Sequence, residues 1–323
     1  MSNYLLHPPA KRTFLAPQIS QPLQSIAMRL DRWLDYESGH AWCESAYKYQ
    51  TISVVAEFAN TVTNLPLIML PLLNVLLIKP YIETVNCIVI MPHILLTVNG
   101  IASTYYHATL NLFGQLIDEI SILWLLMMCL AAYFPVFSFY PQQYHKYMCV
   151  FQYLISTTVG RVRCAIAIIT MVVSTFCFVK PSLNALVLML WSIPSIAIIR
   201  HEAANAGIPE IINSPRKISV LWIAASICWV SDRVFCDFWL FLESNYLICS
   251  NNTAVTISGT PYFHALFHLL SSLAAYNVFI MFSLIDICRR SDKHRYRYRI
   301  KYFPEKGLIR LPYIVLNLDC KYL

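Results

Sequence analysis

The chain has 323 residues, of which 58% are hydrophobic and 13% are charged. Soluble domains usually carry about 25% charged residues, so this composition excludes an intrinsically disordered chain and argues against a soluble enzyme. The formal net charge is +7, but ten of the 24 Lys and Arg residues follow Cys288. Basic residues clustered beside a last apolar segment indicate the cytosolic side of a membrane more than a nucleic-acid-binding surface.

The apolar residues gather into runs long enough to cross a hydrocarbon core about 30 Å thick, separated by short polar connections. We predict an all-α polytopic membrane protein, a seven-transmembrane-helix bundle. In chain order its spans are Val54–Ile78, Val85–Tyr105, Ile120–Phe137, Cys164–Val179, Leu183–Ile199, Ile218–Leu242 and Phe263–Ile287. A further apolar stretch, Tyr147–Val159, is too short to cross and is predicted to be interfacial; if it does cross, the parity changes.

Basic residues alternate between the connections. The connections after spans one, three and five carry several Lys and Arg residues, whereas the even-numbered connections carry Lys180 alone. The positive-inside rule then places the C-terminus in the cytosol and the N-terminus in the lumen, although the basic residues of the N-terminal segment argue the other way. Asn251, in an Asn-Asn-Thr glycosylation sequon after span six, agrees with the charge count because such a site is modified only on the lumenal side.

This orientation divides the chain into three parts. Residues 1–50 are a lumenal N-terminal segment, residues 51–288 a seven-span catalytic domain, and residues 289–323 a basic cytosolic tail. We expect no folded element in the tail.

Five polar side chains lie on the predicted lumenal side of three spans. Ser103 and His107 are at the end of span two, Asp118 lies just before span three, and His264 and His268 start span seven. Polar and ionisable groups at membrane depth are costly and by default mark function. The five residues are therefore the candidate site.

The spacing of the three histidines predicts a zinc site. His264 and His268 are four residues apart on one helix face, and His107 adds a third imidazole, which leaves a fourth position for water. Ser103, one turn before His107, could hydrogen-bond that water or a developing oxyanion, and Asp118 could take and return its proton. The alternative is a buried hydrogen-bond network that holds three helices together, and the sequence does not separate the two.

Other polar residues have weaker patterns. His93 is interpreted as a packed or helix-kinking histidine, and Asp232 with Arg233 as a charge pair that is satisfied inside the bundle or faces a cavity. Glu57 is either a polar lock between helices or part of a second ion site. Of the eleven cysteines, most sit in apolar runs, and three are disulfide candidates: Cys43, Cys236 and Cys249.

Six segments of the chain resemble the alkaline ceramidases, a family of seven-span membrane hydrolases that also has adiponectin-receptor relatives. The two most specific are GIASTYYHATLNLFGQLIDEISILW (100–124) and FHALFHLLSSLAAY (263–276), which contain the Ser-x3-His, Asp and His-x3-His pattern. The others are YESGHAWCES (36–45), VAEFANTVTN (55–64), FVKP (178–181) and WVSDRVFC (229–236). The resemblance runs from about Tyr36 to Tyr313.

The resemblance implies roles for the candidate residues. Zinc would be held by His107, His264 and His268, with Ser103 and Asp118 as catalytic residues. It also implies a lumenal disulfide between the cysteines at 43 and 236. The reaction would be the hydrolysis of ceramide to a sphingoid base and a fatty acid. The partners would be membrane lipids and not nucleic acid, and the protein would lie in the endoplasmic reticulum or Golgi.

The chain departs from the family pattern at a calcium site. Trp42, Glu44 and Glu57 occupy positions of that site, but Ala41 and Ala46 stand where the family has Asp and Asn. Ca²⁺ takes six to eight oxygen ligands, so the site is degenerate and we expect activity to respond little to calcium removal. The lost ligands keep a rival hypothesis open, a seven-span receptor or scaffold that retains the zinc site with little turnover.

Overall fold

A computed structural model of the chain describes residues 42–44, 55–134, 158–180, 184–209, 211, 213–239, 241, 262–294, 297–307 and 310–317. The sequon at Asn251, Cys249, Ala41 and Ala46 lie outside the described residues, as does most of the predicted lumenal segment. The stretch predicted to be interfacial also lies outside them, apart from its last two residues, which belong to a helix.

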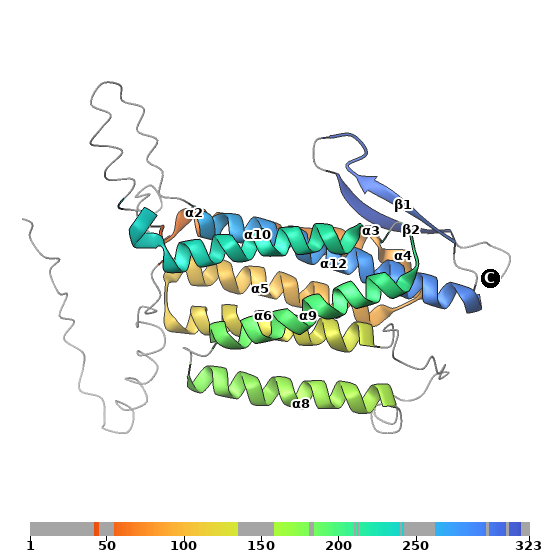
Figure 1. The fold of residues 1–323 in the computed structure, drawn as a ribbon, viewed down its shortest axis with the longest axis horizontal. Coiled ribbons are helices and arrows are strands. Elements are labelled where there is room, and N and C mark those ends of the chain that lie inside the picture. Colours follow the sequence, from red (N-terminus) through yellow and green to blue (C-terminus); the bar gives the residue numbers. More distant parts are fainter. Residues whose placement is uncertain are drawn as a thin grey trace, which may run out of the picture.

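Within this part of the chain, long helices run side by side and a small hairpin follows the last of them (Figure 1). The elements are α2 (Phe58–Val62), α3 (Leu65–Leu77), α4 (Lys79–Thr84), η2 (Cys87–Val89), α5 (Ile90–Thr109), α6 (Leu112–Tyr133), α8 (Thr158–Val179), α9 (Asn184–Ala206), α10 (Ser214–Val234), α12 (Phe263–His294), β1 (Arg297–Phe303) and β2 (Leu311–Asn317). Helix α12 packs against α10 and α3, α5 packs against α3 and α6, and α8 lies outside α6.

The helices make the protein an all-α polytopic membrane protein, as predicted. Five helical stretches of the described chain are long and apolar enough to cross a membrane: Phe58–Leu77, Cys87–Thr109, Leu112–Tyr133, Gly160–Val179 and Phe263–Arg289. Helices α9 and α10, which cover the predicted fifth and sixth spans, have 23 and 21 residues and are also long enough at 1.5 Å per residue. They are not among the five, and α10 carries charged residues near both ends. The count of seven therefore stays a prediction.

Helix α6 begins eight residues before the predicted start of span three, and the reason is local. Leu110 adopts a left-handed conformation (φ 53°) that ends α5, and the Asn111 side chain then accepts a hydrogen bond from the Gly114 N–H at 2.6 Å. Asn is a preferred N-cap residue because its side-chain oxygen satisfies a backbone donor that has no partner within the helix. Asp118 consequently lies on the second turn of α6 instead of in a connection.

Helices α3 and α5 approach each other closely at Gly100. A methyl group added at this glycine would lie 2.8 Å from a side-chain carbon of Ile68 and 2.9 Å from Cβ of Leu67. Small residues allow such close contact between membrane helices. The contact holds α3, and α2 before it, against the helix that carries His107.

The predicted tail contains a folded element. Helix α12 continues to His294, and β1 pairs with β2 in an antiparallel hairpin. Ile314 and Leu316 of the hairpin are buried in the core at the ends of α3, α4 and α12. The expectation of a tail without structure is wrong because RYRIKYF alternates basic with apolar or aromatic residues, which is the period of a half-buried strand.

Candidate functional site

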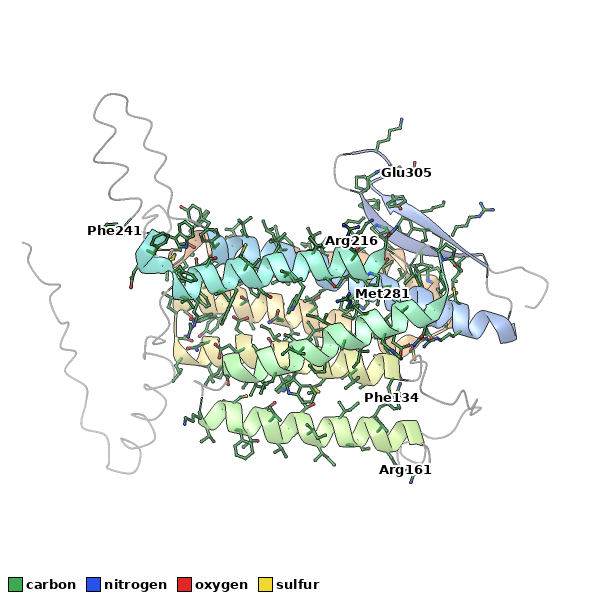
Figure 2. The ribbon with its side chains drawn as sticks, in the orientation of Figure 1. Phe134, Arg161, Arg216, Phe241, Met281 and Glu305 are labelled. Carbon is green, nitrogen blue, oxygen red and sulfur yellow. A yellow bond between two sulfur atoms is a disulfide. The ribbon has the colours of Figure 1, made fainter. Side chains whose placement is uncertain are left out.

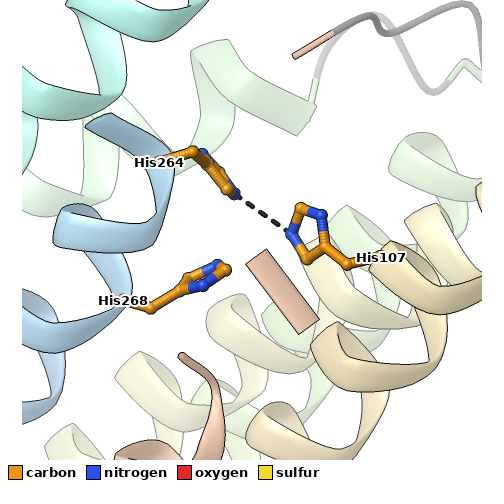
Figure 3. Close-up of side chains that lie close together, drawn as sticks. All are labelled: His107, His264 and His268. Atoms are coloured by element: carbon orange, nitrogen blue, oxygen red, sulfur yellow. Dashed lines mark hydrogen bonds between the residues drawn. The ribbon is translucent and has the colours of Figure 1, made fainter. Parts of the chain in front are cut away.

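Three buried histidines converge at one end of the bundle. His107 lies in the last turn of α5, and His264 and His268 lie in the first two turns of α12. One ligand atom from each lies within 4.8 Å of the other two, and the three rings face a common point (Figure 3). The structure thus brings together residues that are about 160 positions apart in the sequence, as the pattern predicted.

The spacing of the rings fits a metal ion. The Nε2 atoms of His107 and His264 are 3.1 Å apart. Two nitrogens on a tetrahedral Zn²⁺ with bonds of 2.0–2.1 Å lie roughly 3.3 Å apart, so these atoms are already at the separation of two ligands of one ion. Three neutral imidazoles in a buried pocket are a common donor set for this metal. The group can hold a metal ion.

Glu57 orients the first of these ligands. Its carboxylate Oε2 lies 2.6 Å from Nδ1 of His107 and accepts a hydrogen bond from Asn60 Nδ2 at 3.0 Å. Because Nδ1 faces the carboxylate, Nε2 is left to point at the other two histidines. Metal-binding histidines almost always use their second ring nitrogen in this way.

The backbone places Glu57 beside His107. The N–H groups of Ala56 and Glu57 donate to the carbonyls of Ala108 and His107, both at 3.0 Å. These carbonyls belong to the last turn of α5 and have no partner within the helix. Glu57 therefore joins the start of α2 to the end of α5, and a second ion site at this residue stays a prediction.

The other two histidines are oriented in different ways. Nδ1 of His268 lies 3.2 Å from the hydroxyl of Thr63, at the end of α2. His264 Nδ1 is buried, and none of the residues that the structure describes gives it a hydrogen-bond partner. The centre of its ring instead lies 3.7 Å from the centre of the Trp42 ring, with an angle of 30° between the two ring planes. Stacking therefore sets the position of this imidazole.

The short segment 42–44 covers the site and is tied down on both sides. Cys43 forms a disulfide with Cys236, with 5.3 Å between the Cα atoms, so the predicted pairing is confirmed. The Cys43 N–H donates to Asp232 Oδ2 at 3.1 Å. The Glu44 carboxylate accepts the first free N–H groups of α2, from Ala59 at 2.7 Å and from Asn60 at 2.8 Å.

The two acidic residues at the positions of the family's calcium site form hydrogen bonds within the protein. Glu44 caps α2 and Glu57 orients His107, so both carboxylates are engaged with donors of the protein. Ala41 and Ala46 lie outside the described residues. The weak response to calcium stays a prediction.

Ser103 and Asp118 form a hydrogen-bonded pair beside the histidines. The hydroxyl of Ser103 lies one turn before His107 and hydrogen-bonds to the carboxylate of Asp118. The side chain of Asn99 lies 3.3 Å from Asp118 Oδ1 and donates to Ser121 Oγ at 2.9 Å. Asn99 is not among the residues predicted from the sequence, although the four-residue spacing of 99, 103 and 107 places all three on one face of α5.

The neighbouring residues Asp232 and Arg233 contact different groups. Asp232 accepts hydrogen bonds from the backbone N–H groups of Cys43 and His264. The guanidinium of Arg233 lies 5.5 Å from the centre of the Trp42 ring and 5.9 Å from that of Trp229, and this side chain lines a cavity. Arg233 therefore faces the cavity, which was one of the two expectations for the pair.

His93 is a packed histidine, as predicted. It is buried on α5, with Nε2 2.9 Å from Asn74 Nδ2 and Nδ1 2.8 Å from the carbonyl of Val89. Its ring contacts Phe279, with 4.3 Å between the ring centres. Both ring nitrogens are occupied by the protein, so His93 is not available as a metal ligand.

The site opens into a largely apolar cavity of about 290 Å³. Ser103, Asp118, His264 and His268 line one part of the cavity, and Tyr133, Phe282 and Ile218 line another. On α6 the lining runs from Asp118 to Tyr133, which spans about 22 Å at 1.5 Å per residue. The cavity can hold an extended apolar chain with a polar group at the histidines.

The family model and the relatives that match this chain are all ceramidases. The sequence profile of the ceramidase family matches residues 35–315. The chain is 50% identical over 290 residues to an alkaline ceramidase of Caenorhabditis briggsae and 49% identical over 290 residues to one of Caenorhabditis elegans, covering 89% of this chain and 97% of each relative. It is 27% identical over 288 residues to human alkaline ceramidase 1, covering 88% of this chain and 97% of that protein.

Proposed function

The chain belongs to the ceramidase family, and from this premise we propose that it is a zinc-dependent ceramide amidohydrolase. It would cleave the N-acyl amide of ceramide to give a sphingoid base and a free fatty acid. The observation that carries the proposal is a buried triad of histidines next to a Ser–Asp pair at one part of a long apolar cavity.

The chemistry of the metal would be that of other hydrolytic zinc sites. When bound by His107, His264 and His268, zinc supplies a Lewis acid that polarises the amide carbonyl and makes water nucleophilic near neutral pH. Glu57 and Thr63 hold two of these rings in the orientation that presents a free nitrogen to the ion.

Asp118 and Ser103 would carry the proton and stabilise charge. Asp118 takes a proton from the attacking water and then gives it to the leaving amine nitrogen, as a general base followed by a general acid. Asn99 keeps this carboxylate at its position. The Ser103 hydroxyl, which bonds to Asp118 in the structure, can turn to donate to the oxygen on which negative charge develops.

The cavity suits a lipid substrate. Most of its lining is apolar, so the chain of ceramide can enter from the bilayer without crossing water. We further propose that the protein lies in the endoplasmic reticulum or Golgi membrane, with the N-terminus lumenal and the C-terminus cytosolic. The alternation of basic residues between connections supports this orientation.

The decisive experiment measures zinc and turnover in the same sample. Protein purified in detergent and supplied with ceramide should contain about one zinc ion per chain and release sphingosine and fatty acid. A receptor or scaffold that keeps the fold would bind zinc but release no sphingosine above the rate of a heat-denatured sample. Turnover that persists after complete removal of zinc would contradict the proposed mechanism.

Glu57→Gln is expected to weaken zinc binding about tenfold or more, because an amide holds the imidazole less strongly than a carboxylate does and outer partners of metal ligands contribute 10–100-fold. Titration with a zinc chelator of known affinity measures the change. The control is Asp286→Asn, which alters another buried carboxylate that accepts hydrogen bonds from Tyr81 and Asn86. Equal zinc affinities for Glu57→Gln and the unmodified protein would show that Glu57 does not support the site.

A further inference from the structure

The β1–β2 hairpin is fixed to the bundle at the end opposite the histidines, since it follows the last turn of α12 whereas His264 and His268 lie in the first turns. Ile314 and Leu316 are buried against the helices, and Tyr276 of α12 donates a hydrogen bond from its hydroxyl to the carbonyl of Pro312 at 2.8 Å. The hairpin therefore holds its outer side chains at defined positions.

The exposed side chains of the hairpin are mostly basic and aromatic. Arg299 and Lys301 are two residues apart on β1, so they share one face of the strand. Tyr302 and Phe303 are 46% and 45% exposed, and the Arg310 guanidinium lies 5.3 Å from the centre of the Tyr302 ring. The exposed charged residues of the described hairpin are Arg299, Lys301, Glu305, Lys306 and Arg310. Four of these five are cationic.

The hairpin lies beside one end of the helix bundle (Figure 1). Its strands lean away from α12, and its turn lies beside the helices rather than beyond their ends (Figure 1). Glu305, near this turn, stands clear of the helices (Figure 2). Because the helices are long and apolar enough to cross a bilayer, we infer that its headgroup layer meets the hairpin at this end. The positive-inside rule predicts that this layer is the cytosolic one, which carries the anionic lipids.

We propose that the hairpin is a binding site for anionic phospholipid headgroups, made by Arg299 and Lys301, which share one face of β1. The cations attract the headgroup phosphates and carboxylates, and Tyr302 and Phe303 rest at the level where the polar and apolar parts of the lipid meet. Charge complementarity selects an anionic lipid over a zwitterionic one. The site is independent of the hydrolytic reaction, because it lies at the other end of the bundle.

Native mass spectrometry of the full-length protein in detergent tests the proposal. The protein is titrated with phosphatidylserine or with phosphatidylcholine of the same acyl chains, and the bound lipids are counted. We expect preferential binding of phosphatidylserine, a roughly fivefold loss in Arg299→Gln and a roughly 20-fold loss in Arg299→Gln/Lys301→Gln at low salt. Salt should reduce the preference, because these side chains are exposed.

Arg161→Gln is the matched control, since Arg161 is an exposed arginine on α8 at the same end but on the opposite side of the bundle (Figure 2). It should change phosphatidylserine binding less than twofold. An equal loss in Arg161→Gln and Arg299→Gln would overturn the proposal in favour of a general charge effect. Displacement of the lipid by inorganic phosphate at an equal concentration would also overturn it, because the site would then prefer a free anion. Thermal unfolding of each variant near that of the unmodified protein confirms that the comparison concerns folded chains.

Discussion

Replacement of any one of the three histidines by alanine is expected to abolish ceramide hydrolysis and to release the metal. His107→Ala, His264→Ala and His268→Ala each leave two imidazoles for an ion that needs three protein ligands in a hydrolytic site. The loss should reach the background of the assay, because the same ion polarises the substrate and activates the water. Zinc per folded chain and sphingosine release are measured on the same preparations.

His93→Ala is the control for this experiment. His93 is as buried as the three ligands and lies on the same helix as His107, but its ring nitrogens face Asn74 and Val89. Its removal should lower the temperature of unfolding and leave zinc bound to the chains that remain folded. Full activity in His268→Ala, or loss of zinc from folded His93→Ala, would remove the mechanism as proposed.

Asp118→Asn should lower kcat by about 10²–10⁴-fold while zinc stays bound, since this is the range that general acid–base catalysis contributes. Asparagine keeps the size of the side chain and can still bond to Asn99 and Ser103, so the fold should be little affected. The change removes a proton acceptor without removing a metal ligand. Steady-state kinetics with ceramide, combined with zinc content, measures both quantities.

Ser121→Ala provides a matched control for Asp118→Asn. Ser121 is buried on the same helix and bonds to Asn99 and to the carbonyl of Asp118, but it does not line the cavity. We expect it to retain most of the activity. A kcat within threefold of the unmodified value in Asp118→Asn would exclude this carboxylate as the proton acceptor. Loss of zinc from Asp118→Asn would assign it a role in holding the metal instead.

The residues of the candidate site could be found in the sequence because the relevant spacing is local. His264 and His268 share a helix face through the geometry of one helix, as do Ser103 and His107, and this geometry holds whatever the rest of the fold does. The helical class followed from composition for a similar reason. A chain segment in lipid must satisfy its own backbone hydrogen bonds, so long apolar runs without charges become helices.

The side chains that contact these residues are set by the packing of distant segments of the chain. A local sequence pattern does not predict that packing. Glu57 reaches His107 because two backbone hydrogen bonds join its segment to the end of α5. Trp42 stacks on His264 because a disulfide and Asp232 hold its segment over α12. From the sequence alone, Glu57 had two interpretations and three cysteines were candidates for a disulfide. The family resemblance implied which two of them pair, and the structure confirms that pairing.

The start of α6 and the hairpin show the same division. The N-cap at Asn111 is a local sequence signal. Because α6 begins directly after it, Asp118 lies in a helix and not in the predicted connection. The alternation in RYRIKYF is also local, but alternation describes a strand only where a surface exists to bury its apolar side. That surface is formed by the ends of the adjacent helices α3 and α4 together with the end of α12, where contacting residues such as Tyr81 and Asp286 are 205 positions apart along the chain. Ile314 and Leu316 are buried on that surface. The removal of their apolar area from water contributes the free energy that stabilises the folded hairpin.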